Sequence, residues 1–174
     1  MIEIEKTYLA KFLPEELEQC SSKEIFDLYL PASSIHPKIR IRKNGDKYEI
    51  TKKVANNEED TSESTEHTIE ITREEFDGMR NIDAKKVRKI RYYYKHEGRE
   101  AEIDVFQDDL LGLVLADFEF DSNDIKNGHV MPDFCLVDVT QGDFIAGGLL
   151  AGKSYKDIEN KLKSYEYKQL YIKE

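Results

Sequence analysis

Met1-Ile2-Glu3-Ile4-Glu5-Lys6-Thr7-Tyr8-Leu9 is the stretch from which the rest of the chain is best interpreted. As a β-strand it places Ile2 and Ile4 on one face, because successive side chains alternate. Glu3 and Glu5 then share the opposite face with Thr7. Two neighbouring carboxylates repel each other unless a cation lies between them, and hard Mg²⁺ or Mn²⁺ prefers oxygen ligands. The stretch therefore predicts either a solvated strand face or a divalent metal site.

Composition narrows the class of protein. The chain has 174 residues, which suits a single domain over 1–174 with a real core. Its formal net charge of −10 argues against a general nucleic-acid-binding protein, whose surface is normally basic. Cys20 and Cys135 lie far apart without metal-ligand spacing, which favours free thiols in a reducing compartment. No signal-peptide pattern or membrane-spanning apolar stretch is visible, so we expect a cytoplasmic protein without a membrane partner.

Alternating and β-branched stretches predict strands along most of the chain. We expect them at 2–12, 36–43, 47–54, 66–72, 87–95, 99–106 and 113–121. Asn44-Gly45 predicts a hairpin turn between two of them. The stretch 25–30 alternates like a strand but follows a helix capping box at 21–24, so both readings stay open.

Helices and loops are predicted mainly by caps and turn residues. Thr72 is expected to cap a helix over 73–79, and Ser154 to cap another through about Tyr165. The stretch 144–150 is predicted to be helical, with Gly152 closing it. Pro14 is expected to begin a first helical turn at 14–17. The polar, acidic stretch 56–64 is predicted to be a mobile loop.

The predicted strands share one property: one face is apolar and the other carries like charges. Acids fall on some strands, at Glu3 and Glu5, Glu66 and Glu70, Glu102 and Asp104, and Asp117 and Glu119. Bases fall on others, at Arg40, Arg42, Lys53, Lys89 and Arg91. An open sheet with a solvated face, or a closed barrel with a charged lumen, would both give this pattern. Segregated like charges favour the barrel, since a polyanion with a bound metal neutralises both sets.

The order of the motifs resembles that of the CYTH superfamily, the triphosphate tunnel metalloenzymes. The matching elements are Glu3-Ile4-Glu5, Arg40-Ile41-Arg42, Ile50-Thr51-Lys52-Lys53, Lys89-Ile90-Arg91-Tyr92, Glu102-Ile103-Asp104-Val105-Phe106, Leu115-Ala116-Asp117-Phe118-Glu119 and Val139-Thr140 through Leu150-Ala151. Each element is weak by itself, but together they cover nearly the whole chain in the superfamily's order.

The resemblance implies an α+β fold, mainly an antiparallel closed β-barrel of about eight strands. Helices would pack outside it, with a C-terminal helical segment at about 141–166 near one mouth. It also implies metal-dependent hydrolysis of a triphosphate, which is inorganic triphosphate, thiamine triphosphate or a nucleoside triphosphate. The alternatives are a class IV type adenylate cyclase and a polyphosphate- or nucleotide-binding module without turnover. A homodimer is also expected.

The resemblance further implies roles for individual residues. Mg²⁺ or Mn²⁺ would be bound by Glu3, Glu5, Asp117 and Glu119. The triphosphate would be bound by Arg40, Arg42, Lys53, Lys89 and Arg91. Glu102 or Asp104 would orient the attacking water or complete the metal shell, and Glu66 and Glu70 would be further tunnel acids.

Two positions depart from the superfamily's pattern. The lysine of its Glu-x-Glu-x-Lys signature falls on Thr7, while the adjacent Lys6 is expected to point to the apolar side of the strand. Asp117 stands where the superfamily has glutamate, which shortens the reach of the carboxylate by one methylene. The missing lysine implies weaker binding, an altered choice of substrate or a lost catalytic role.

Overall fold

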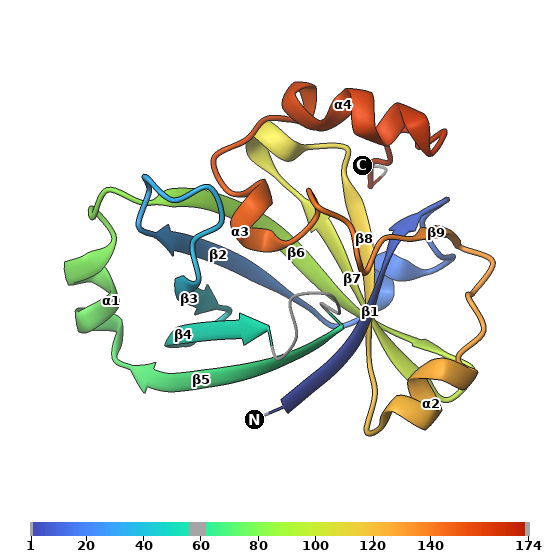
Figure 1. Ribbon diagram of the computed structural model, residues 1–174, viewed down its shortest axis with the longest axis horizontal. Helices are drawn as coiled ribbons and strands as arrows, with labels where there is room; N and C mark the ends of the chain where they lie inside the picture. Colours follow the sequence, from blue (N-terminus) through green and yellow to red (C-terminus); the bar gives the residue numbers. More distant parts are fainter. Residues whose placement is uncertain (1, 56–61, 173–174) are drawn as a thin grey trace.

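A closed antiparallel β-barrel forms the body of the protein (Figure 1). The computed structural model describes residues 2–55 and 62–172. Within them the strands are β1 (Ile2–Ala10), β2 (Ser22–Leu30), β3 (Ile39–Asn44), β4 (Lys47–Ala55), β5 (Glu63–Ile71), β6 (Lys85–His96), β7 (Arg99–Phe106), β8 (Val114–Glu119) and β9 (Cys135–Asp138).

The barrel closes because β1 pairs on both of its edges. Residues 5–9 of β1 pair with β8, while residues 2–4 pair with β5 on the other edge. The strands between them follow the order β5-β4-β3-β2-β6-β7-β8, so eight strands complete the ring. β9 adds to β1 beyond the point where β5 has left it. The predicted closed barrel of about eight strands is thus confirmed.

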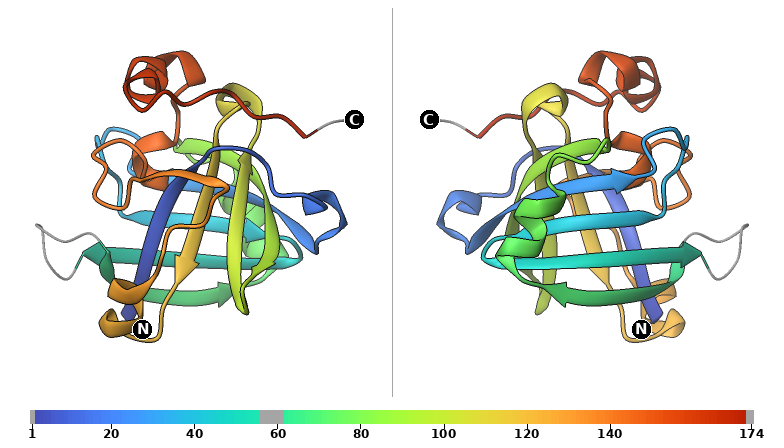
Figure 2. Two further views of the ribbon diagram at one scale, coloured as in Figure 1. Left: turned by 90° about the vertical axis from the view of Figure 1, so that its right-hand side faces the viewer. Right: turned by 90° about the vertical axis from the view of Figure 1, so that its left-hand side faces the viewer.

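Short helices cover the outside and one end of the barrel. They are α1 (Arg73–Met79), α2 (Asn123–Gly128), α3 (Gly147–Leu150) and α4 (Tyr155–Ser164), with 3₁₀ turns η1 (Leu17–Gln19) and η2 (Asp108–Leu110). Figure 2 shows α1 against the outer side of β2–β5, and α3 and α4 gathered at the far end from the N-terminus. No helix in the described residues is long and apolar enough to cross a membrane.

The apolar outer face of β2–β5 explains the position of α1. Phe76 of α1 is buried against Leu28 and Ile41, whose side chains point out of the barrel. The helix begins with a complete capping box, in which Thr72 accepts from the Glu75 N–H and Glu75 accepts from the Thr72 N–H. A second outer cluster packs over β1, β7 and β8 around Tyr8, Phe118 and Phe134.

One end of the lumen is filled by apolar side chains. Inward-facing residues at the ends of five barrel strands gather there: Leu9, Tyr29, Val87, Phe106 and Leu115. They pack with Leu150, the last residue of α3, and with Ile158 and Leu162 of α4. The C-terminal helices therefore close this end of the barrel, while charged residues line the remainder.

The structure corrects several local predictions. The ambiguous stretch 25–30 belongs to strand β2, because its inward side chains complete the barrel wall. The strand predicted at 2–12 ends at Ala10, and helix α3 begins only at Gly147 rather than at residue 144. The predicted loop 56–64 is wrong at Glu63 and Ser64, which begin β5; 56–61 lie outside the described residues.

Other local predictions are confirmed. Gly45 adopts φ +59° between β3 and β4, and Gly152 adopts φ +76° after α3, where the left-handed backbone favours glycine. The helices after Thr72 and Ser154 form as expected.

The helical turn predicted at 14–17 is instead a 3₁₀ turn that begins at Leu17. β9 and α2 had no clear signal, since both are short.

Candidate active site

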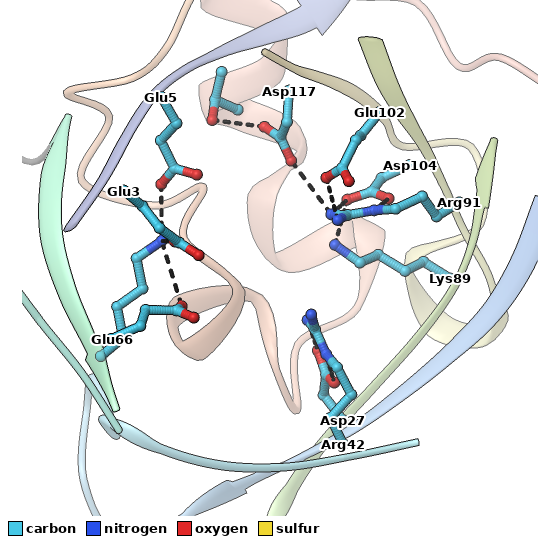
Figure 3. A network of polar contacts seen from close by, with 12 residues as sticks. Glu3, Glu5, Asp27, Arg42, Glu66, Lys89, Arg91, Glu102, Asp104 and Asp117 are labelled. Atoms are coloured by element: carbon cyan, nitrogen blue, oxygen red, sulfur yellow. Dashed lines mark hydrogen bonds and ion pairs between the residues drawn. The ribbon is translucent and has the colours of Figure 1, made fainter. Parts of the chain in front are cut away.

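The strand register turns both sets of charged residues into one lumen (Figure 3). Acids from β1, β5, β7 and β8 and bases from β3, β4 and β6 point toward a common central space. The alternation predicted from the sequence is confirmed on each of these strands. Lys6 points outward, with its Nζ 4.0 Å from Asp138, as expected.

Lys53 lies between the two glutamates of β1. Its Nζ is 3.1 Å from Glu3 Oε2 and 3.0 Å from Glu5 Oε1, and 3.8 Å from Glu66 Oε1. Burial disfavours the charged ammonium, but Glu5 and Glu3 outweigh it and raise the pKa of Lys53. Burial likewise opposes ionisation of Glu3, yet Lys53 brings the pKa of that carboxyl below its ordinary value. The repulsion expected between Glu3 and Glu5 is thus offset here by an ammonium group.

A second cluster lies across the lumen on β6, β7 and β8. Arg91 binds Asp104 through two hydrogen bonds, Nε to Oδ1 over 2.7 Å and Nη2 to Oδ2 over 2.8 Å. It also donates to Glu102, and its Nη2 is 3.6 Å from Asp117 Oδ2. Lys89 donates to the same Asp104 carboxylate. Three carboxylates from β7 and β8 and two bases from β6 are therefore linked in one network.

In this network Asp104 binds the side chains of both Arg91 and Lys89. Its side chain is fully buried, and burial by itself would raise its pKa. Arg91 and Lys89 more than reverse that effect and lower the pKa far below the ordinary value. A carboxylate so tightly paired is a poor proton acceptor near neutral pH. Its geometry suits orientation of Arg91 and Lys89.

Asp117 and Glu119 carry negative charge that nearby bases compensate poorly. Burial, followed by the charges of Asp104 and Glu5, raises the pKa of Asp117 to about 7. Partial burial and the charge of Glu102 raise the pKa of Glu119 as well, although its side chain is exposed. An excess of carboxylate oxygens in a confined lumen is the donor set that hard divalent cations prefer. The described residues contain no group of three acidic, histidine or cysteine side chains already in position to hold a metal ion.

A buried ion pair that the sequence did not predict completes the basic side of the lumen. Asp27 of β2 accepts from Arg42 Nε over 2.7 Å and from Arg42 Nη2 over 2.8 Å. Asp27 was missed because its stretch was left open between helix and strand, and only the strand reading turns it inward. The pair holds Arg42 with its guanidinium facing the lumen (Figure 3).

Arg40 is the base with the most remaining capacity for an anion. Its Nη2 is 3.7 Å from Glu66 Oε1, a long ion pair. Its Nε is buried and finds no hydrogen-bond partner among the described residues. A buried unsatisfied donor costs free energy until an acceptor reaches it. Arg40 is therefore suited to bind an anionic ligand.

The predicted acids on β5 divide into two positions. Glu66 is opposite Lys53 in the register and contacts the lumen cations. Glu70 lies two inward positions further along, opposite Glu49, and is exposed. A hydroxyl pair of buried Thr51 and exposed Thr68, with oxygens 2.9 Å apart, separates the two. Glu66 thus belongs to the central network, whereas Glu70 lies at the exposed rim.

Comparisons of the sequence and of the structure with known proteins both find an inorganic triphosphatase. No family profile matches the sequence. The chain is 30% identical to the inorganic triphosphatase of Nitrosomonas europaea over 144 residues, which are 81% of this chain and 91% of that protein. The crystal structure of the inorganic triphosphatase NE1496 superposes with a TM-score of 0.65 at 25% identity, covering 87% of this chain and 95% of that one. The PH1012 protein from Pyrococcus horikoshii shares the fold, with a TM-score of 0.51 at 20% identity over 72% and 82% of the two chains.

Proposed function

Because the chain belongs to the CYTH superfamily of triphosphate tunnel metalloenzymes, we propose that it hydrolyses inorganic triphosphate in its barrel lumen with a divalent cation. The observation that carries this proposal is the gathering of acidic and basic side chains in one lumen. Carboxylates of β1 and β8 and the guanidinium and ammonium groups of β3, β4 and β6 point into the same space. A polyphosphate with a bound cation offers partners to both kinds of side chain.

Inorganic triphosphate is the favoured substrate for two reasons. The relative from Nitrosomonas europaea is named an inorganic triphosphatase. In addition, one end of this lumen is filled by the apolar cluster around Phe106 and Leu115, against α3 and α4. An inorganic triphosphate needs only charged contacts, and these are what the remainder of the lumen presents.

The cation would be Mg²⁺ or Mn²⁺, bound by Glu3, Glu5, Asp117 and Glu119. All four are oxygen ligands, and burial followed by the charges of neighbouring carboxylates raises the pKa of Asp117 and of Glu119. When bound, the metal supplies Lewis-acid stabilisation of charge on the phosphate oxygens. Glu3 and Glu5 must first give up Lys53, which in this structure neutralises them.

The bases would bind the triphosphate oxygens, and paired acids would orient them. Arg40 would bind through its guanidinium, whose Nη2 makes only a long ion pair with Glu66. Arg42 is oriented by Asp27, and Arg91 by Asp104. Glu102, which is partly exposed to the lumen beside Arg91, would orient the attacking water, whereas Asp104 would position Arg91. Catalysis would then consist mostly of positioning and charge neutralisation, as in phosphoryl transfer generally.

The test is phosphate release from inorganic triphosphate, ATP and thiamine triphosphate, each with Mg²⁺, Mn²⁺ or EDTA. We expect release from inorganic triphosphate that needs metal and that Glu3→Gln/Glu5→Gln abolishes. Glu74→Gln, on the exposed side of α1, is the matched control and should retain the activity.

The same experiment separates the alternatives. Cyclic AMP and pyrophosphate from ATP would identify a cyclase and refute the proposal. A triphosphate-induced rise in melting temperature without any phosphate release would identify a binding module instead.

A further inference from the structure

Thr7, where the superfamily has its signature lysine, makes a specific contact with a lumen acid. It lies directly opposite Asp117 in the β1–β8 register, and both side chains face inward. The Thr7 hydroxyl donates to Asp117 Oδ1 over 2.7 Å. A lysine would bring a positive charge to this carboxylate, whereas threonine brings a donor and no charge. The short threonine also reaches an aspartate that is itself one methylene shorter than glutamate.

The backbone of Thr7 is fixed from outside the barrel. Its N–H donates to Thr140 Oγ1 over 3.0 Å, and its carbonyl accepts from the Val139 N–H over 2.8 Å. Thr140 is in turn oriented by Asp138, whose Oδ1 accepts from the Thr140 N–H over 2.9 Å and from its hydroxyl over 2.6 Å. A relay of hydrogen bonds therefore runs from Asp138 at the end of β9 through Thr140 and Thr7 to Asp117.

The relay determines how Asp117 presents its oxygens. Oδ1 is engaged by Thr7, which leaves Oδ2 directed toward Arg91, with Nη2 at 3.6 Å. The neighbouring charges of Asp104 and Glu5 repel this buried carboxylate. Without the Thr7 donor, rotation away from these acids would relieve the repulsion. The Thr7 hydroxyl opposes that rotation without adding a charge to the lumen.

We propose that Thr7 is a positioning residue, which fixes Asp117 through the relay so that its second oxygen would be in position to bind the metal. The inference rests on the proposed function, because it assumes a divalent cation at Asp117. It differs from a simple loss of the lysine, in which Thr7 would merely leave a gap. In this protein the position has a donor whose orientation the segment 138–140 controls.

The test compares Thr7→Val, which keeps the β-branched shape but removes the hydroxyl, with Thr7→Ser, which keeps the donor. Mn²⁺ binding to the EDTA-stripped protein is measured by calorimetric titration without substrate. Loss of a group that orients a metal ligand typically weakens metal affinity about 10–100-fold. We expect a loss of about tenfold or more for Thr7→Val and a change within about twofold for Thr7→Ser. Thr140→Val should move the affinity in the same direction, because it releases the Thr7 backbone.

Thr51→Val is the matched control, since it removes a buried hydroxyl whose partner is Thr68 rather than an acid. Its Mn²⁺ titration should equal that of the wild type, while urea melts of all variants check the fold. Equal Mn²⁺ affinity for wild type and Thr7→Val would overturn the inference, as would a Thr7→Ser as impaired as Thr7→Val. Failure of the proposed function would be seen separately, as no phosphate release by the wild-type protein.

Discussion

The buried pair of Asp27 and Arg42 allows a quantitative test of how the lumen is built. The Asp27 side chain is 2% exposed and the Arg42 side chain 9%, and two hydrogen bonds of 2.7 and 2.8 Å join them. Asp27→Asn keeps the shape and one acceptor but removes the charge. The guanidinium of Arg42 then remains buried without its counterion.

The expected cost follows from that burial. Removing one partner of a buried ion pair costs about 3–5 kcal/mol. The asparagine oxygen can still accept one of the two hydrogen bonds, so we expect the lower limit, about 3 kcal/mol. For a chain of this length, that corresponds to a fall in melting temperature of roughly 6–12 °C. Asp77→Asn, in an exposed ion pair on α1, should cost no more than about 1 kcal/mol.

The pH dependence gives a second readout on the same variant. Burial alone would raise the pKa of Asp27, but Arg42 reverses this and the net pKa is lowered. A lowered native pKa contributes stability that is present above the unfolded value and is lost as pH falls through the native value. The wild type should therefore lose stability below about pH 4 more steeply than Asp27→Asn does.

Urea unfolding at pH 7 and at several values down to pH 3, followed by circular dichroism, measures both effects. Triphosphate should in addition raise the melting temperature of Asp27→Asn by more than that of the wild type, since the freed guanidinium gains a new anionic partner. A loss below about 1 kcal/mol at pH 7, similar to Asp77→Asn, would refute the reasoning from burial.

Further predictions concern the packing around the barrel. A Cβ on Gly148 would lie 2.7 Å from the Pro37 carbonyl oxygen, so Gly148→Ala should lower the free energy of unfolding by about 1–3 kcal/mol in urea melts. Gly78→Ala, whose Cβ would have nothing within 4 Å, should instead stabilise the protein by about 0.5–1 kcal/mol. The reverse order would contradict the close contact of α3 with Pro37. Thr72→Ala removes the cap of α1 and should cost about 1 kcal/mol, and an unchanged midpoint would mean that the cap is not formed in solution. Tyr167→Phe leaves the Val114 N–H without its buried acceptor, while the Gly112 carbonyl still accepts from the Leu170 N–H, so a loss of about 1–3 kcal/mol is expected, and faster hydrogen exchange at Val114 should accompany it.

The barrel could be predicted from the sequence because its signal is repeated on many strands. Most strands place one or two charged side chains on the same face, two positions apart, and the register confirms that these share one lumen. At 21–24 the sequence contains a helix capping box, so the alternating stretch after it could be a helix or a strand. Because β2 was left undecided, the inward-facing Asp27 was missed. Only tertiary pairing with β3 and β6 decides this strand.

The site was predictable as a set of residues but not as a set of contacts. Periodicity assigns Asp104 to the lumen, yet it carries no sign that two cations would engage this one carboxylate. α3 and α4 close one end of the lumen by packing on apolar residues that face inward near the strand ends, such as Leu9 and Phe106. The sequence alone does not show that these residues meet the C-terminal helices. The relay through Thr140 joins residues 133 positions apart in the chain, which no local pattern records.

The ion pairs of the lumen also have a consequence for folding. Asp27 and Arg42 stand directly opposite each other across β2 and β3, as do Arg91 and Asp104 across β6 and β7. A slip of one residue in either ladder would turn one partner toward the apolar outer face and leave the other in the lumen without its counterion. The polar residues that face the ligand space therefore also discriminate against misregistered barrels, so variants that neutralise them should refold more slowly or to mixed products. An enzyme of this design cannot alter its lumen charges freely, because the same charges specify how its strands are aligned.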